Sequence, residues 1–178
     1  NAKSILDTMS TNTSENVAAV VAAMAKAKRI DFYGMGPSHV VALDAQIKCM
    51  RLSIPSSAFG DRISMMLNAK AFHDDTLAFI ISYTGKTTEM LEVARELVRV
   101  GSSTVSITSV KPNDLVDLCT YNLFVDSTES WNRLGGMSSR ISTLNLIDIL
   151  FTALINSDYQ KYAQNMSKNM VNNVSRSN

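Results

Sequence analysis

Hydroxyl side chains are concentrated in one short segment, ISYTGKTTEM at residues 81–90, where an apolar run meets an amphipathic one. Ser82, Thr84 and Thr87 are hydrogen-bond donors, and Gly85 allows the backbone to turn inward and present its amides. A helix that starts here adds unpaired N–H groups and a partial positive charge. This combination is typical of a phosphate site. We therefore expect these residues to bind an anion.

A second glycine-bearing turn, GMGPS at residues 34–38, follows another apolar run. Ligands of open parallel sheets bind where neighbouring strands end, and both turns are predicted to lie at such ends. Gly36 and Ser38 are therefore expected to close the site from the other side, and Tyr83 completes the expected ligand-binding set. Pro37 removes one backbone N–H that would otherwise face the ligand.

More ordinary roles exist for two of these residues. A hydroxyl at a helix start is usually a cap, and Thr87 alone fits that interpretation. Capping requires one hydroxyl, however, and leaves Ser82 and Thr84 unexplained. Lys86 could attract a phosphate, although a lysine at a turn is commonly a solvated charge.

Two familiar phosphate motifs are excluded by position. Gly85-Lys86-Thr87 ends like a P-loop, but the first glycine of that motif would fall at Ile80, inside an apolar run. The second turn begins like a dinucleotide fingerprint, but its third glycine position holds His39. Neither an ATPase nor a nicotinamide-binding protein is expected.

An aldose–ketose isomerase would need a positioned base, usually Glu or His, near the sugar carbons. The candidates are Glu129, His39 and His73, and Trp131 could lie against a sugar face. Each also fits an ordinary role: solvated loop residues for Glu129 and His73, a structural histidine for His39, and a core aromatic for Trp131. No pattern marks a catalytic or metal-binding constellation. We expect no catalytic residue, metal or cofactor, with Glu129 as a further ligand contact.

Strand-like and helix-like segments alternate along the chain. The predicted strands are residues 29–34, 56–59, 76–82, 104–108 and 122–125. The predicted helices are residues 15–28, 39–52, 61–70, 89–100, 115–119 and 140–156. This alternation favours an α/β fold of three layers, in which helices cover both faces of a mostly parallel sheet of about five strands.

Apolar stripes distinguish several helices. The run at residues 140–156 is so apolar that it must be largely buried, and its Arg140 and Asp148 are expected in packing or subunit contacts. Three other segments carry apolar residues at helical spacing: Val17, Val20, Val21 and Met24; Val40, Leu43, Ile47 and Met50; and Tyr159, Tyr162, Met166, Met170 and Val174. The first and last of these stripes are candidate surfaces for subunit contact.

The composition is that of one globular domain. The 178 residues are 46% hydrophobic and 19% charged, and the net charge of +1 lacks the basic field that non-specific nucleic-acid binding requires. The two cysteines, Cys49 and Cys119, are expected to be buried free thiols of a cytoplasmic protein. No uninterrupted apolar run is long enough to span a membrane.

The two turns together resemble the sugar isomerase (SIS) domain of phosphosugar-binding proteins, over residues 15–157. The residues that carry the resemblance are Gly34, Gly36, Ser38, Ser82, Thr84, Gly85, Thr87 and Glu89. Thr84 departs from the serine that is common in the family, and its methyl group narrows the pocket. The segment at residues 138–154 is similar to the closing helix of SIS domains in RpiR-type transcriptional regulators.

This resemblance implies a flavodoxin-like SIS domain that senses a sugar phosphate for a DNA-binding regulator. Residues 3–178 would be one domain with flanking helices, and residues 1–2 would be a tag remnant. DNA would be bound by a helix-turn-helix domain N-terminal to this chain. The protein would be a homodimer or homotetramer, and no membrane partner is expected. The alternatives are a phosphosugar isomerase, with Glu129 in the region where such enzymes place a catalytic carboxylate, or a dimerisation module that binds no sugar phosphate.

Overall fold

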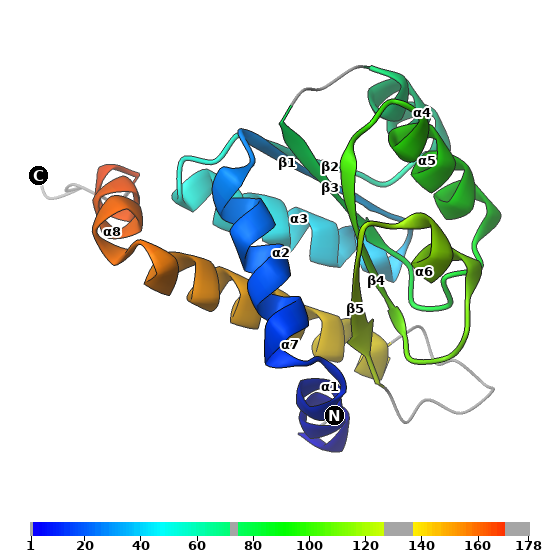
Figure 1. Cartoon of the computed structure of the whole chain (residues 1–178), viewed down its shortest axis with the longest axis horizontal. Helices are drawn as coiled ribbons and strands as arrows, with labels where there is room; N and C mark the ends of the chain where they lie inside the picture. Colours follow the sequence, from blue (N-terminus) through cyan, green and yellow to red (C-terminus); the bar gives the residue numbers. More distant parts are fainter. Residues whose placement is uncertain (1, 72–74, 127–136, 170–178) are drawn as a thin grey trace, which may run out of the picture.

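A sheet of five parallel strands forms the centre of the computed structural model, which describes residues 2–71, 75–126 and 137–169 (Figure 1). The strands are β1 (Arg29–Gly34), β2 (Ser56–Phe59), β3 (Thr76–Ile81), β4 (Ser103–Ser109) and β5 (Tyr121–Val125). Their spatial order is β2-β1-β3-β4-β5, which is the flavodoxin-like order. The predicted parallel α/β sheet is confirmed.

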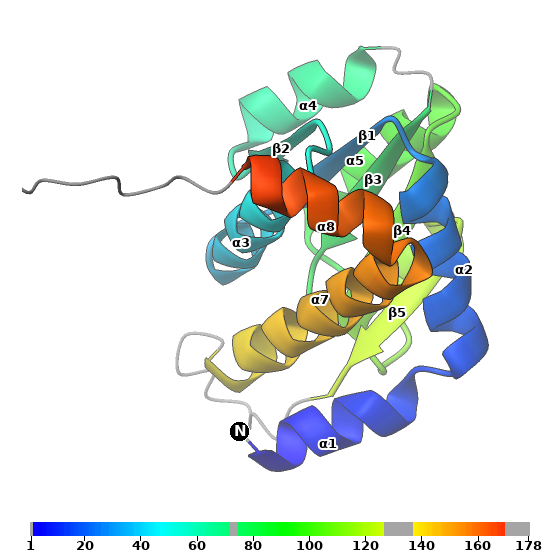
Figure 2. The same cartoon turned by 90° about the vertical axis from the view of Figure 1, so that its left-hand side faces the viewer.

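Helices cover both faces of this sheet, which confirms the three predicted layers (Figures 1 and 2). The helices are α1 (Ala2–Thr11), α2 (Ser14–Lys26), α3 (Pro37–Arg51), α4 (Arg62–Lys70), α5 (Thr88–Arg99), α6 (Asp114–Leu118), α7 (Met137–Ser157) and α8 (Tyr159–Lys168). One face is covered by α2, α3 and α7, and the other by α4, α5 and α6. The outer helix α8 turns away from the C-terminal end of α7 (Figure 2), and its Asn165 side chain donates to the carbonyl oxygen of Leu52, directly after α3, at 2.9 Å.

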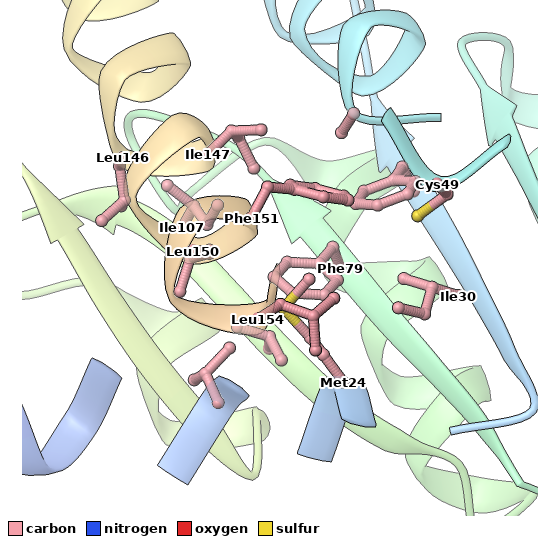
Figure 3. Packing of buried hydrophobic residues seen from close by; sticks show 14 of the residues in the cluster. Met24, Ile30, Cys49, Phe79, Ile107, Leu146, Ile147, Leu150, Phe151 and Leu154 are labelled. Atoms are coloured by element: carbon pink, nitrogen blue, oxygen red, sulfur yellow. The ribbon is translucent and has the colours of Figure 1, made fainter. Parts of the chain in front are cut away.

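The larger core lies between the sheet and the α2–α3–α7 layer (Figure 3). Phe32 and Phe79, from adjacent strands, stack with their ring centroids 5.2 Å apart. Met24 of α2 and Leu150 and Leu154 of α7 pack around them. Although α7 has the length and hydropathy of a membrane-spanning helix, these contacts make it the core helix that the sequence predicts.

Both cysteines are free and buried, as the sequence predicts. Burial raises the pKa of the Cys49 thiol to about 12 and that of Cys119 to about 11. Both residues are therefore neutral at physiological pH and poor nucleophiles.

A fully buried carboxylate, Asp31 of β1, ties the sheet to α4. Arg29 Nε donates to both of its oxygens, at 2.9 and 3.0 Å. The backbone N–H of Ser57 and the Asn68 side chain donate two further hydrogen bonds, at 3.1 and 2.9 Å. A buried charge is tolerated only with such partners. This network joins β1, β2 and α4.

Replacing Asp31 by alanine should lower the free energy of unfolding by about 3 kcal/mol, because it leaves an arginine and two further donors without their acceptor. Urea denaturation followed by circular dichroism measures this loss. Lys28→Ala is the matched control, since the Lys28–Asp75 pair is 80% and 51% exposed and such pairs contribute about 0–1 kcal/mol. Equal losses in the two variants would contradict the assigned role of the Asp31 network.

The sequence prediction contains no element before residue 15, whereas α1 is a helix that closes the free edge of β5. The Asn12 side chain pairs with the backbone C=O and N–H of Phe124, at 2.7 and 2.8 Å. The Thr8 hydroxyl accepts from Asp126 N–H at 3.0 Å and donates to the carbonyl oxygen of Asp126 at 3.3 Å. Side chains thus take the place of a sixth strand.

The apolar stripe of α3 does not face the core, although amphipathic helices normally bury their apolar side. Between 41% and 59% of the surface of each of its residues is exposed. We call these residues the α3 stripe: Val40, Leu43, Ile47 and Met50. The opposite, buried face consists mostly of small residues: Val41, Ala42, Ala45 and Cys49. Small side chains let α3 lie close to the sheet, so the larger ones point outward.

Of the two stripes expected to form subunit contacts, the α2 stripe is largely used within the chain itself, and the α8 stripe is used there only through Tyr162 among its described residues. Val20, Val21 and Met24 of α2 belong to the larger core, and Tyr162 of α8 is also buried there. Tyr159 and Met166 are exposed, while Met170 and Val174 lie outside the described residues. A subunit contact through the α2 stripe would require unpacking the core.

Candidate functional site

A pocket of about 290 Å³ opens at the carboxyl ends of β1 and β3. The chain leaves β1 towards β2 on one side and leaves β3 towards β4 on the other, so this is the point where the strand order reverses. The lining residues come from the turns after both strands and from α7: Met35, Pro37, Ser38, Ile81, Ser82, Tyr83, Thr84, Thr87, Met90 and Ser139. Of the expected set, Ser38, Ser82, Tyr83, Thr84 and Thr87 are brought together here.

Three helices begin at this pocket. Ser38 is the second residue of α3, Thr87 is the N-cap of α5, and Ser139 is the third residue of α7. Each helix N-terminus carries a partial positive charge, so an anion is favoured at their meeting point. The sequence prediction begins this helix only at residue 140, and Ser139 was not predicted as a lining residue. The serine pair before the apolar run was the available signal.

The hydroxyl of Thr87 does not cap α5. It lies instead 3.3 Å from the Ser82 hydroxyl, which is 5% exposed. Four other helices do begin with a side-chain cap, formed by Thr13, Asp61, Asn113 and Asp158. The capping interpretation of Thr87 is therefore wrong. Its side chain lines the pocket beside Ser82, and the first turn of α5 receives no hydroxyl cap from it.

Gly85 does not line the pocket but shapes the loop that does. Its φ is +61°, and an added Cβ would lie 1.9 Å from Asn113 Oδ1. Asn113 is buried, accepts from Val116 N–H at 3.3 Å and donates to the Lys111 carbonyl at 2.8 Å. The start of α6 therefore supports the loop from behind. The sequence did not single out Asn113, because Gly85 and Asn113 are far apart in the chain.

Backbone hydrogen bonds hold the rest of the loop. Gly85 N–H donates to the Ser82 carbonyl at 2.9 Å, and Ser109 N–H donates to the Tyr83 carbonyl at 2.8 Å. Thr84 Oγ1 accepts from Lys86 N–H at 3.3 Å, while the exposed Lys86 side chain does not line the pocket. The pocket thus offers neutral donors at a preformed turn.

A narrow cavity of about 20 Å³ adjoins the pocket and extends it along α7. It shares Ser38, Tyr83 and Ser139 with the pocket and adds Arg140 and Thr143. No carboxylate or imidazole lines either space among the residues that the structure describes. The described lining can therefore hold an anion and a polar ligand, but it presents no conventional general base.

The remaining expected residues lie elsewhere. Gly36 is the exposed N-cap of α3 and does not line the pocket. The His39 ring packs against Gly60, and its buried Nδ1 has no hydrogen-bond partner within the described ranges. Glu129, Trp131 and His73 lie outside the described residues. No cluster of metal-ligating side chains is found in the part of the chain that the structure describes.

A second cavity, of about 360 Å³, lies at the other end of the strands, beside the amino ends of β3, β4 and β5. Its lining includes Ala27 and Val100, which are the C-caps of α2 and α5. Helix C-termini carry partial negative charge, so this cavity is a poor place for an anion. The partial charges of the helix ends therefore favour the pocket at the carboxyl ends of β1 and β3 as the anion site.

Comparisons with known proteins agree with this geometry. The uncharacterized HTH-type transcriptional regulator TTE0211 of Caldanaerobacter subterraneus subsp. tengcongensis is 36% identical over 171 residues, which cover 94% of this chain and 61% of that protein. Vibrio vulnificus NanR, in complex with ManNAc-6P, has a TM-score of 0.88 at 24% identity, with 94% of this chain and 64% of that chain covered.

A hypothetical protein of Methanococcus jannaschii, whose structure led to the inference of a 3-hexulose-6-phosphate isomerase function, has the same fold. Its TM-score is 0.75 at 19% identity, with 92% of this chain and 90% of that chain covered. The SIS domain family model matches residues 23–153, which include all five strands, both turns and most of α7. The chain therefore belongs to the SIS domain family.

Proposed function

We propose that the pocket binds the phosphate group of a sugar phosphate, and that this domain is the ligand-sensing part of an RpiR-type transcriptional regulator. The observation that carries the proposal is the meeting of three helix N-termini with the hydroxyls of Ser82, Thr84 and Thr87, where Thr87 is not used as a cap. Neutral donors and helix dipoles together favour a dianion without a lysine in the described lining.

The sugar portion would extend from the phosphate towards the start of α7. Ser139 lines the pocket, and Arg140 and Thr143 line the cavity that adjoins it. These side chains can hydrogen-bond to sugar hydroxyls or to a sugar acid. The choice among sugars would therefore depend on α7 more than on the phosphate loop.

Sensing is favoured over isomerisation by the composition of the lining. Proton transfer between adjacent sugar carbons needs a positioned base, and the described lining contains no carboxylate or imidazole. Similarity to an HTH-type regulator points the same way. An isomerase is the second candidate, because the fold is shared with the Methanococcus jannaschii protein. Glu129 would be its base.

The complete protein would carry more than this chain, which spans 61% of the length of the regulator TTE0211. A helix-turn-helix domain N-terminal to residues 3–178 would bind DNA, with residues 1–2 a tag remnant. The protein would act in the cytoplasm as a homodimer or homotetramer. A sugar phosphate that prefers one subunit arrangement would shift the population and change DNA affinity.

Isothermal titration calorimetry against hexose, pentose and amino-sugar phosphates, including ManNAc-6P, tests the binding function. At least one sugar phosphate should bind with a dissociation constant below about 100 µM, and its unphosphorylated sugar should bind about 100-fold more weakly or not at all. NMR of the bound sugar phosphate should show no conversion to its aldose or ketose partner. Binding by no member of the panel would contradict the proposal, and turnover would favour the isomerase.

A further inference from the structure

Three fully buried hydroxyl side chains lie on one face of β4: Thr104, Ser106 and Thr108. They alternate along the strand, so they point to the same side of the sheet. Val105 and Ile107, which lie between them, belong to the larger core, so the hydroxyls face the opposite layer of α4, α5 and α6. Buried hydroxyls need hydrogen-bond partners, so this face of β4 must meet polar groups.

Each of these hydroxyls is paired with a residue of the segment 113–122, which we call the α6 crossover. Hydrogen bonds weaken steeply with distance and angle, whereas apolar contacts are not directional. The pairs therefore hold the α6 crossover in one position on β4. They join Asn113 Nδ2 to Thr108 Oγ1 at 3.2 Å, Ser106 Oγ to Asn122 Oδ1 at 2.5 Å, and Thr120 N–H to Thr104 Oγ1 at 3.0 Å.

The first residue of the α6 crossover touches the phosphate loop, residues 82–87. Asn113 is 7% exposed and lies directly behind Gly85, whose added Cβ would meet its side chain. Leu115 N–H also donates to the Gly85 carbonyl, at 3.3 Å. The phosphate loop therefore cannot move without carrying the start of α6 or breaking these contacts.

The last residue of the α6 crossover, Asn122, joins α6 to two strands. It lies in β5, accepts from Ser106 of β4, and donates to the Val116 carbonyl of α6 at 3.2 Å. The helix has five residues, of which Leu115 is the buried one, so polar pairs supply much of its attachment. A displacement of α6 is therefore passed to β5 through the Asn122 side chain.

The position of β5 is passed in turn to α1. Asn12 pairs with the backbone of Phe124, and the fully buried Thr8 pairs with that of Asp126. Because all strands are parallel, these pairs lie at the same end of the sheet as the pocket (Figures 1 and 2). β5 is two strands from β3, a distance of about 10 Å. The α6 crossover spans that distance with hydrogen bonds.

We propose that the α6 crossover couples the pocket to α1, so that an anion in the phosphate loop stabilises the attachment of α1 to β5. This coupling rests on the proposed function, because it needs a phosphate group in the loop. An anion that holds the loop hydroxyls together also holds Gly85 against Asn113, and Asn122 passes the restraint to β5. Coupling is reciprocal, so the attachment of α1 must raise the affinity for the anion by the same factor.

Amide hydrogen exchange of the full chain, followed by NMR with and without inorganic phosphate, tests the coupling. Phe124 and Asp126 are the reporter amides, because their N–H groups donate to Asn12 and Thr8. At phosphate concentrations well above about 1 mM, with chloride keeping the ionic strength constant, their exchange should slow about fivefold or more. The amide signals of residues 85–87 should shift in the same titration, because these residues surround the anion.

A reference amide separates this coupling from a general gain in stability. Ile54 N–H donates to the Cys49 carbonyl, beyond α3, at 2.9 Å and belongs to no part of the α6 crossover. Its exchange should change less than about twofold, whereas stabilisation of the whole fold would slow all three amides alike.

Asn122→Ala breaks the connection at a residue that does not line the pocket. The phosphate loop amides should still shift, but phosphate should slow the exchange of Phe124 and Asp126 by less than about twofold. Asn165→Ala is the matched control, because it removes a similar hydrogen bond, from Asn165 Nδ2 to the Leu52 carbonyl at 2.9 Å. This control should respond to phosphate like the unmodified chain.

Three results would overturn the coupling and leave the binding function standing. They are loop shifts without slower exchange of the reporter amides, equal slowing at Ile54, and undiminished slowing in Asn122→Ala. The last result would assign the connection to α7, which α1 also contacts. If neither inorganic phosphate nor a sugar phosphate of the calorimetric panel shifts the loop amides, the binding function itself fails and the coupling fails with it.

Asn12→Ala tests the reverse direction from α1 to the pocket. The substitution removes both hydrogen bonds between Asn12 and Phe124, and reciprocity then predicts phosphate affinity about fivefold weaker. Asn165→Ala should bind phosphate within about twofold of the unmodified chain. NMR titration measures both affinities, and circular dichroism checks that both variants are folded. Unchanged affinity in Asn12→Ala would contradict the coupling.

Discussion

Replacing Gly85 by alanine is expected to abolish measurable sugar-phosphate binding, with a loss of about 100-fold or more in affinity. The added Cβ would lie 1.9 Å from Asn113 Oδ1, in a backbone conformation with φ of +61° that L-residues rarely adopt. The loop must therefore move away from α6. Because Ser82, Thr84 and Thr87 are on either side of Gly85, this movement would separate their hydroxyls. Calorimetric titration measures the loss.

Gly101→Ala is the control, because it separates the effect of backbone strain from the effect of moving the phosphate loop. Gly101 also has a positive φ, +83°, but nothing lies within 4 Å of its added Cβ. It lines the second cavity, at the amino ends of the strands and away from the pocket. This variant should lose about 1–2 kcal/mol of unfolding free energy and keep its ligand affinity. Normal binding by a folded Gly85→Ala variant would show that the loop geometry is not required.

The double variant Ser82→Ala, Thr84→Val should also have a large effect, a loss of about 100-fold or more in affinity for the sugar phosphate. A hydrogen bond to a charged group is worth about 1.5–3 kcal/mol, so each hydroxyl accounts for about 10-fold to 100-fold. Affinity for the unphosphorylated sugar should change little, because both hydroxyls are assigned to the phosphate. Calorimetry with the phosphorylated and unphosphorylated sugars measures both.

Thr88→Val is the control for this prediction. Thr88 is exposed, is the first residue of α5 and does not line the pocket. Its substitution should leave affinity within about twofold. The urea midpoint of the double variant should also stay close to that of the unmodified chain, since the hydrogen bond between the Ser82 and Thr87 hydroxyls is long, at 3.3 Å. Unchanged phosphate affinity in the double variant would remove the basis of the proposed site.

The sequence was sufficient to predict the sheet and one side of the pocket, because both depend on local patterns. Every residue of β3 is buried, and its continuous apolar run is the signal of a central parallel strand. The hydroxyl turn after it follows directly in the chain. Ser38 and Ser82 could be paired in advance because parallel strands end at the same edge of a sheet.

Contacts between distant residues were not predictable in this way. Ser139 reaches the pocket through the docking of α7, and Asn113 supports Gly85 from another crossover. The direction of the α3 stripe was also missed, because Ala42, Ala45 and Cys49 form the packed face in place of the larger aliphatic residues. Periodicity identifies a helix, but the size of the opposing side chains decides which face approaches the sheet.

The fastening of α1 has a mechanical consequence. Thr8 and Asn12 hold the helix to the end of β5 by polar pairing, and α1 also contacts α7, whose first turn borders the pocket. A small shift of the β5–α7 boundary would rotate α1 as a lever, while the central packing stays intact. Because Thr8 is fully buried, breaking its pairs would leave polar groups without partners, so α1 should follow such a shift and keep its contacts.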